Sequence, residues 1–244
     1  MHDHHWSKLR AGAMGAMAAL ALAACNGNAD DAATVPEGDE ATARDDNVAI
    51  PVMGPERRIV AFGDSLFAGF GLKDADGDSY PSKLEAALRA KGINAKIANA
   101  GVSGDTTAGG ARRISFVLDA QEEKPDLFIL ELGANDALRR IAPEETRANM
   151  KAMLEELKKR EIPVLLMGLR APANLGPEYQ QAFDSMYTDL AKEYNAALIP
   201  FWLEDIYQDA SLFQADRIHP TEEGIEALVA STLDAVNAAL PKDE

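Results

Sequence analysis

The stretch Arg58-Ile59-Val60-Ala61-Phe62-Gly63-Asp64-Ser65-Leu66 holds a short apolar run that ends in a glycine and two polar residues. Apolar runs of this length, rich in β-branched or aromatic residues and followed by turn residues, are typical of buried strands. Four similar runs follow at intervals along the chain. The sequence therefore predicts five strands, at residues 58–62, 95–99, 127–131, 163–168 and 197–200.

Longer amphipathic stretches separate these runs. Residues 143–160 and residues 221–240 each carry apolar side chains at helical spacing. A further helix is expected from Ser79 or Tyr80 to Lys91, and another runs from Pro177 towards Asn195. Strands that alternate with helices indicate a parallel sheet, so we expect one α/β domain with helices on both faces. Ligands of such sheets bind beyond the carboxyl ends of the strands.

Composition excludes several classes of function. The 244 residues suit one ordinary domain, and a net charge of −16 disfavours nucleic-acid binding because phosphates would be repelled. Cys25 is the only cysteine, which excludes an intramolecular disulfide, a CxxC motif and a cysteine-ligated zinc site. Three of the four histidines lie in the first five residues, so His219 alone is left for the folded domain. We expect neither a metal nor a cofactor.

The N-terminal segment has the features of an export signal. Lys8 and Arg10 precede an uncharged run at residues 11–24, which is too short for an ordinary membrane-spanning helix. The run ends in Leu22-Ala23-Ala24-Cys25, which resembles the bacterial lipobox, and Asn26 resembles the pattern for transfer to the outer membrane. We therefore expect an exported protein anchored through a lipidated Cys25, at the outer membrane and facing the periplasm; a conventional cleaved signal is the alternative.

The composition of the next segment predicts a flexible tether between the signal and the folded domain. Residues 25–57 are rich in Asp, Glu, Ala, Gly and Pro and lack apolar periodicity, so they cannot bury enough surface to offset their ordering entropy. The expected organisation is a signal peptide at residues 1–24, an acidic disordered tether at residues 25–57 and a folded domain at residues 58–244. The early histidines His2, His4 and His5 lie on the segment expected to be removed.

Polar blocks follow the predicted strands and precede the last helix. In chain order they are Gly63-Asp64-Ser65-Leu66, Gly104, Gly133-Ala134-Asn135-Asp136 and Asp216-Arg217-Ile218-His219. Together they resemble the markers of the SGNH (GDSL-type) hydrolases, in particular the bacterial thioesterase I, lysophospholipase L1 and arylesterase branch. The resemblance extends from about Arg58 to Leu240 and implies a three-layer, flavodoxin-like fold with a five-stranded parallel sheet.

These residues also make chemical sense by themselves. A serine hydroxyl is a poor nucleophile until a base removes its proton, and His219 is the only base of its type available to Ser65. Asp216 lies three residues before His219, a separation that one turn can close, so its carboxylate can orient the imidazole. Backbone N–H groups of Ser65 and Gly104 can stabilise an oxyanion, and the resemblance adds the side-chain amide of Asn135.

Competing motifs fail on spacing. The glycines near Gly69 and Gly71 lack the third glycine of a dinucleotide fingerprint, and the chain has neither a Walker motif nor a GxSxG elbow. Asp64 and Asp136 offer a carboxylate pair for glycosidic or metal chemistry, but each neighbours a marker residue, and we expect each to hold its loop.

The substrate is the least determined feature. Apolar residues beside the markers are candidates to line an acyl groove, and ordinary packing is the alternative for each: Leu66, Phe67, Phe70, Leu138, Ile141, Leu175 and Ile218. Residues 137–143 and 170–177 are the loops expected to close over a substrate. We expect a monomeric esterase acting on small esters, thioesters or lysophospholipids. The alternatives are a carbohydrate or peptidoglycan O-deacetylase and a non-catalytic lipid-binding lipoprotein.

Overall fold

The computed structural model describes residues 51–242, in which five parallel strands form one sheet. Its order is β2-β1-β3-β4-β5, with register pairs such as Ile59 with Ile97 and Ile59 with Leu127. This is the strand order of the flavodoxin-like fold that the family resemblance implied. The strands are β1 (Met53–Gly63), β2 (Ile93–Gly101), β3 (Leu127–Leu130), β4 (Val164–Met167) and β5 (Ala197–Ile199).

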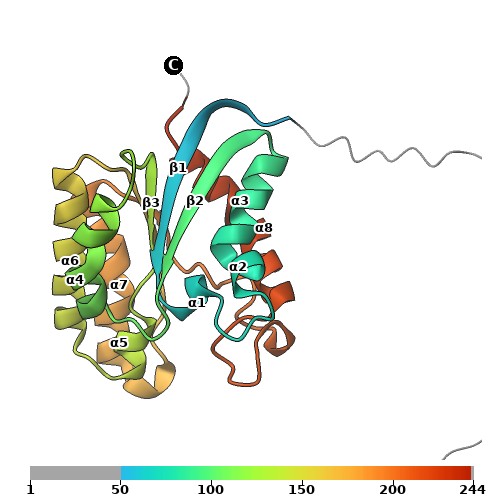
Figure 1. Ribbon diagram of the computed structural model, residues 1–244. Helices are drawn as coiled ribbons and strands as arrows, with labels where there is room; N and C mark the ends of the chain where they lie inside the picture. The colour runs from blue at the N-terminus through green and yellow to red at the C-terminus, as the bar shows by residue number, and fades with distance from the viewer. Residues whose placement is uncertain (1–50, 243–244) are drawn as a thin grey trace, which may run out of the picture. The chain divides into compact units, whose positions relative to one another are not determined.

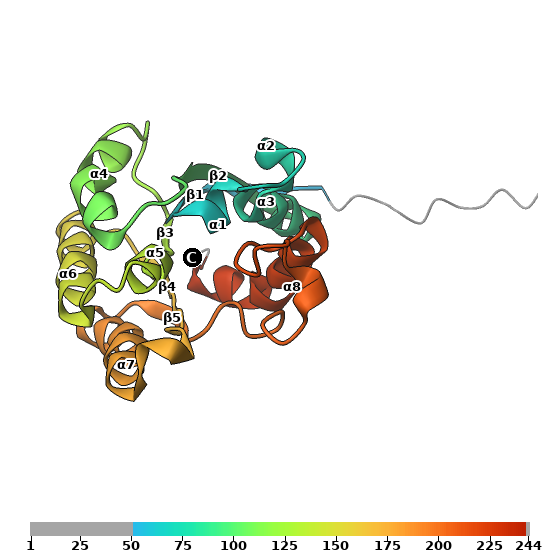
Figure 2. The ribbon, with the colours of Figure 1, turned by 90° about the horizontal axis from the view of Figure 1, so that it is seen from below.

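Helices cover both faces of the sheet. One face carries α3 (Tyr80–Ala90) and α8 (Glu222–Ala239), which pack against each other (Figure 1). The other carries α4 (Thr107–Asp119), α6 (Pro143–Lys159) and α7 (Pro177–Tyr194), which follow one another in the view along the strands (Figure 2). The short helices are α1 (Ser65–Ala68), α2 (Ala75–Asp78), α5 (Ala134–Leu138), η1 (Ala173–Leu175) and η2 (Ala210–Leu212).

The helical stripes read from the sequence are the buried faces. In α6 the buried apolar side chains are Met150, Met153, Leu154 and Leu157, which matches the expected spacing. Helix α4 was not expected, because Gly109 and Gly110 in its first turns weaken the helical signal. Its glycine at position 110 allows close packing, since a Cβ there would lie 2.4 Å from Leu132 Cδ1.

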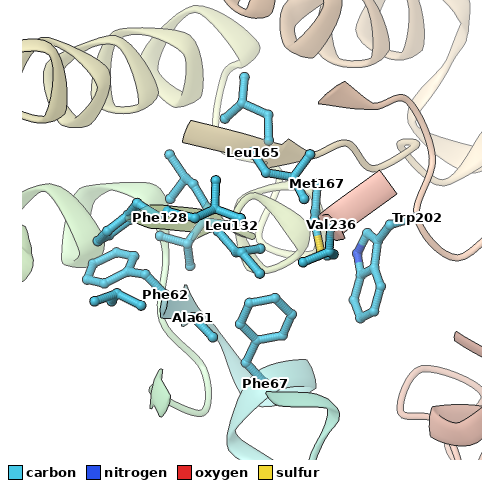
Figure 3. Close-up of a cluster of buried hydrophobic side chains, with 14 of the residues drawn as sticks. Ala61, Phe62, Phe67, Phe128, Leu132, Leu165, Met167, Trp202 and Val236 are labelled. Atoms are coloured by element: carbon cyan, nitrogen blue, oxygen red, sulfur yellow. The ribbon is translucent and has the colours of Figure 1, made fainter. Parts of the chain in front are cut away.

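The core lies between the sheet and the two helical layers. All four residues of β3 are buried, as expected for the central strand of the sheet. Figure 3 shows Phe62, Phe128 and Leu132 gathered on one side of the sheet, and Phe67 beside Trp202 on the other. The ring of Phe67 also stacks on Tyr80, with centroids 5.3 Å apart. This aromatic cluster fixes the segment directly after β1.

The first strand begins earlier than its sequence pattern indicates. Residues 53–57, expected in the acidic tether, belong to β1, and Met53 pairs with Ile93 of β2. Residues 53–56 are exposed, so no apolar alternation reveals this extension. The expected signal peptide, Cys25 and the early histidines lie outside the described residues. Within residues 51–242, no helix combines the length and apolar character that a membrane crossing requires.

Candidate active site

Ser65 lies where β1 ends and α1 begins, at the carboxyl edge of the sheet. Asp64 makes the turn between the two elements, and its carboxylate accepts a hydrogen bond from the Leu66 N–H at 3.0 Å. This contact caps α1 and satisfies one of the N–H groups that a helix leaves free at its start. The side chain of Ser65 is thereby presented on the first residue of a short helix, with the residue 9% exposed.

The structure brings Ser65, His219 and Asp216 together, although 154 positions separate the serine from the histidine. Ser65 Oγ lies 2.9 Å from His219 Nε2, and His219 Nδ1 lies 2.7 Å from Asp216 Oδ2. The other carboxylate oxygen of Asp216 accepts the backbone N–H groups of Ile218 and His219. Because Asp216 is held on both oxygens, it fixes the orientation of the imidazole ring.

The pKa of Asp216 shows that its carboxylate is ionised at neutral pH. Burial acts to raise the pKa, but hydrogen bonds from the His219 ring and from the His219 and Ile218 N–H groups lower it to about 2. An ionised Asp216 is a hydrogen-bond acceptor only, so Nδ1 of His219 carries the proton. That arrangement leaves Nε2 of His219 facing the hydroxyl of Ser65 as the acceptor of its proton.

The loop before α8 is tied to the segment after α1. Gln214 N–H donates to the carbonyl of His219 at 2.7 Å, and the Gln214 side-chain amide donates to the carbonyl of Phe70 at 2.8 Å. The ring centroids of Phe70 and His219 lie 4.4 Å apart. Arg217 takes a left-handed conformation at φ 61°, which completes the tight turn between Asp216 and His219. These contacts hold the imidazole over the serine.

Gly104 and Asn135 lie in the same cleft as Ser65 and His219. Gly104 has a φ of 78°, and its carbonyl accepts a hydrogen bond from Arg139 Nη2 at 2.7 Å. The side-chain amide of Asn135, on α5, donates to Asp64 Oδ2 at 2.9 Å. An amide nitrogen carries two hydrogens, so a second one remains for a group bound in the cleft.

Two adjoining clefts form the mouth of the site. The first, of about 220 Å³, contains the serine and the histidine, and the second, of about 380 Å³, is lined largely by apolar side chains. They share Leu66, Ala134, Leu138 and Ile218. Of the candidate acyl-groove residues, Leu66, Phe70, Leu138 and Ile218 line these clefts. Phe67 does not, because it is fully buried in the aromatic cluster, and Ile141 and Leu175 are not among the lining residues.

Asp136 is buried and holds α5 to its neighbours. Its carboxylate accepts hydrogen bonds from the Thr107 N–H at 2.9 Å, from the Thr107 hydroxyl and from the Thr146 hydroxyl at 3.3 Å. Helix α5 is therefore tied to α4 and α6. Asp64 and Asp136 each stabilise a loop, and only Asp64 lines the cleft.

Sequence reasoning missed residues that support the site. Arg113 pairs with Asp105 at 2.7 Å and donates to the carbonyls of Ala100 and Gly63, which braces the ends of β1 and β2. It lies on α4, the helix that the sequence pattern did not reveal. Glu131 is fully buried beside Asp64. The sequence did carry a signal for Glu131, because a charged residue at the end of a buried apolar run requires a hydrogen-bonding or charged partner.

The described part of the chain has no cluster of side chains suited to bind a metal ion. Within residues 51–242, no group of three or more His, Cys, Asp or Glu side chains is arranged to hold a metal ion.

Comparison with known proteins places the chain among acyl hydrolases. Residues 61–227 match the model of the GDSL-like Lipase/Acylhydrolase family. The chain is 38% identical over 162 residues to Esterase TesA of Pseudomonas aeruginosa, a match that covers 66% of this chain and 79% of that protein. It is 34% identical over 165 residues to Thioesterase 1/protease 1/lysophospholipase L1 of Escherichia coli K12, covering 68% of this chain and 76% of that protein.

A solved structure shows the same architecture. The crystal structure of AlinE4, an SGNH-hydrolase family esterase, is 58% identical to this chain with a TM-score of 0.65. The alignment covers 78% of this chain and 100% of AlinE4. All four marker blocks lie within residues 61–227, the region that matches the family model.

Proposed function

Because this chain belongs to the GDSL-like lipase/acylhydrolase family, we propose that it is a serine esterase in which Ser65 is the nucleophile, His219 the base and Asp216 the orienting carboxylate. The observation that supports this proposal most directly is the pair of hydrogen-bond distances that links the three side chains, 2.9 Å and 2.7 Å. Both are within the range for proton transfer. Ser65 and His219 line a cleft at the carboxyl edge of the sheet.

The reaction follows from these positions. His219 Nε2 takes the proton of Ser65 as Oγ bonds to the carbonyl carbon of the ester, and the carbonyl oxygen becomes an oxyanion. The imidazolium then protonates the leaving alcohol or thiol, and the bond from the carbonyl carbon to that group breaks. Water, deprotonated by His219, attacks the acyl carbon of the resulting acyl-serine. The bond from that carbon to Ser65 Oγ then breaks, the imidazolium returns its proton to Oγ, and the carboxylic acid is released. Asp216 stabilises the imidazolium in both halves of the reaction.

The oxyanion is stabilised by donors already in place. The backbone N–H groups of Ser65 and Gly104 and the second amide hydrogen of Asn135 are the proposed donors. Asn135 is held by Asp64 before any substrate arrives. Preorganised donors need no rearrangement as the charge develops, which is why such groups supply a large share of the rate enhancement.

The adjoining apolar cleft is the proposed site of the acyl chain. Its lining includes Leu169, Phe201 and Tyr207 in addition to the four residues that it shares with the catalytic cleft. An apolar cleft contiguous with the nucleophile favours arylesters, acyl thioesters and lysophospholipids over strongly polar acyl donors. A monomer is sufficient, because a single chain supplies all the proposed catalytic groups and both clefts.

The site of action is proposed from the N-terminal sequence. We propose that the protein is exported, lipidated on Cys25 and held at the outer membrane, where the acidic segment before Met53 leaves the catalytic domain free to meet substrates in the periplasm.

A fluorophosphonate probe and a p-nitrophenyl ester test the proposed chemistry together. Wild-type protein should be labelled stoichiometrically and should hydrolyse p-nitrophenyl butyrate, whereas Ser65→Ala should lose both. Ser103→Ala is the matched control, because Ser103 lines the same cleft but is not the serine bonded to His219. Labelling that persists in Ser65→Ala would show that another residue is the nucleophile, whereas a folded wild type that is neither labelled nor active would favour a binding protein.

Chain length separates the two enzymatic readings. Rates with p-nitrophenyl esters from acetate to laurate should rise beyond acetate if the apolar cleft binds the acyl chain. Activity confined to acetate, with release of acetate from acetylated carbohydrate, would instead support the O-deacetylase. Substituting Leu138, which lines both clefts, by Asp should lower activity on the longer esters more than on acetate.

A further inference from the structure

A second carboxyl group is buried directly behind the proposed catalytic centre. Glu131 follows the last residue of β3 and is completely buried. Its Oε2 accepts the Asp64 N–H at 3.3 Å, and its Oε1 has no hydrogen-bond partner among residues 51–242. A Cβ on Gly63 would lie 2.7 Å from Oε2, so the backbone after β1 approaches this carboxyl group closely. The proposed mechanism gives Glu131 no task.

Asp64, its neighbour, connects two parts of the catalytic machinery. One oxygen of the Asp64 carboxylate caps the helix that begins at Ser65, and the other accepts the side-chain amide of Asn135. Asp64 is also fully buried. Whatever fixes the Asp64 carboxylate therefore fixes the nucleophile segment and one proposed oxyanion donor at the same time.

The pair holds one negative charge. Two adjacent carboxylates removed from water cannot both ionise without a large electrostatic cost. Asp64 accepts two N–H bonds of 3.0 and 2.9 Å, whereas Glu131 accepts a single bond of 3.3 Å. The carboxylate that accepts more and shorter hydrogen bonds, that of Asp64, keeps the negative charge. The proton of the pair therefore resides on Glu131.

The pKa directions agree with this distribution. Burial raises the pKa of Asp64 to about 6, against the lowering effect of its bonds from Leu66 and Asn135. Burial and the negative charge of Asp64 raise the pKa of Glu131 well above its usual range. The other ionisable or charged groups that face the pair from neighbouring elements are His219, Asp105 and Tyr187, together with Arg113, which donates to the carbonyl of Gly63.

We propose that Glu131 is a positioning residue for ester hydrolysis, and that its neutral carboxyl group donates a hydrogen bond to Asp64 and so holds the Asn135 amide in place. This inference rests on the proposed function, because it acts through the oxyanion donor. Glu131 does not touch the substrate. It sets the position of a carboxylate that in turn orients the Asn135 amide.

Two substitutions separate the hydrogen bond from the bulk of the side chain. Glu131→Gln keeps a neutral donor of nearly the same shape, whereas Glu131→Met keeps the volume and removes the donor. We expect kcat for p-nitrophenyl butyrate to fall roughly 10- to 100-fold in Glu131→Met, with KM nearly unchanged, and to stay within about threefold of wild type in Glu131→Gln. Glu85→Met, which removes the acceptor of the part-buried Ile97 N–H between α3 and β2, is the matched control for the loss of a hydrogen-bonded glutamate away from the clefts and should leave kcat unchanged.

A double-mutant cycle tests the route through Asn135. If Glu131 acts by orienting that amide, Glu131→Met should cost little more in the Asn135→Ala background, whereas independent effects would multiply. The pH profile of kcat provides a further readout, for which Glu131→Gln is the only variant needed. Loss of the Glu131 proton puts a second negative charge beside Asp64 and removes the proposed hydrogen bond, so kcat should fall. Wild type should therefore show an ionisation on the alkaline side that Glu131→Gln lacks.

The outcomes distinguish this inference from the function on which it rests. If wild type neither hydrolyses the ester nor reacts with the fluorophosphonate, the proposed function fails. If wild type is active and Glu131→Met matches it, or its effect multiplies fully with that of Asn135→Ala, the positioning role is wrong while the esterase stands. Should Glu131→Met fail to fold, identical pH profiles of wild type and Glu131→Gln would still overturn the inference.

Discussion

At the scale of single residues, the side chain of Asn135 is the part of the site whose role depends most on its geometry. It is held by Asp64 at 2.9 Å and lines the cleft beside Ser65. We expect Asn135→Ala to lower kcat roughly 10²- to 10³-fold with little change in KM, because the lost donor acts on charge that develops only in the transition state. Steady-state kinetics with p-nitrophenyl butyrate measure this split.

The matched control is Asn237→Ala on the exposed side of α8, which should leave both constants unchanged. Fluorophosphonate labelling of Asn135→Ala should be slower but complete, since Ser65 and His219 remain in place. A rise in KM with an unaltered kcat would show that Asn135 binds the ground state and would remove it from the oxyanion hole.

At the scale of secondary-structure elements, the position of α5 depends on Gly133. This residue precedes α5 with a φ of 127°, and a Cβ there would lie 2.3 Å from the Tyr187 hydroxyl oxygen. The same hydroxyl donates to the carbonyl of Leu132. Gly133→Ala should therefore both destabilise the protein and displace Asn135, and urea unfolding together with kcat measures the two effects.

Gly176→Ala separates backbone strain from the steric clash. Gly176 also has a positive φ, 89°, but a Cβ there meets nothing within 4 Å. We expect it to lose about 1 kcal/mol of stability from strain and to keep its kcat. Equal losses of stability and activity in the two variants would show that contact with Tyr187 does not position α5.

At the scale of the whole molecule, the buried carboxyl pair predicts how stability depends on pH. The pKa of Asp64 rises from 3.8 to about 6 on folding, so the folded state holds this proton more tightly than the unfolded chain. That contribution is complete below pH 3.8 and is lost as the pH rises through about 6. Asp216 acts in the opposite sense, because its pKa falls to about 2, and its contribution is lost as the pH falls from 3.8 towards 2.

Urea unfolding of wild type and Asp64→Asn between pH 4 and 7 isolates the first effect. The stability of wild type relative to the variant should decrease with rising pH by up to about 3 kcal/mol, since the variant has no proton to release. A difference between the two proteins that stays constant over this range would show that Asp64 ionises with its ordinary pKa.

The full chain also carries a prediction about its location. Cys25→Ala should move the protein from the membrane fraction to the soluble fraction of the cell envelope and abolish incorporation of radiolabelled palmitate, because the thiol is the proposed site of lipidation. Ser103→Ala should remain in the membrane fraction. Unchanged fractionation of Cys25→Ala would favour a conventional signal peptide.

The sequence predicted most strands and helices of the fold, but it did not predict the first residues of β1 or helix α4. The strand runs, the buried stripes of α6 and α8 and the order of the sheet followed from periodicity and from the family resemblance. The early start of β1 and the helix α4 did not, since an exposed strand and a helix with two adjacent glycines lack the expected patterns. Phe67 looked like a groove residue because adjacency in sequence does not say which way a side chain points.

The sequence by itself determined which chemistry was available, because it leaves a single histidine after position 5 and puts polar blocks after three of the strands. Only the tertiary structure decided which atoms meet. Parallel strands bring their carboxyl ends to one edge of the sheet, where Ser65 lies. Folding also brings His219 to this edge, so that its Nε2 lies 2.9 Å from Ser65 Oγ although the two residues are 154 positions apart in the chain. It also buries Glu131 against Asp64, a contact between β3 and the end of β1 that exists only once the chain has folded.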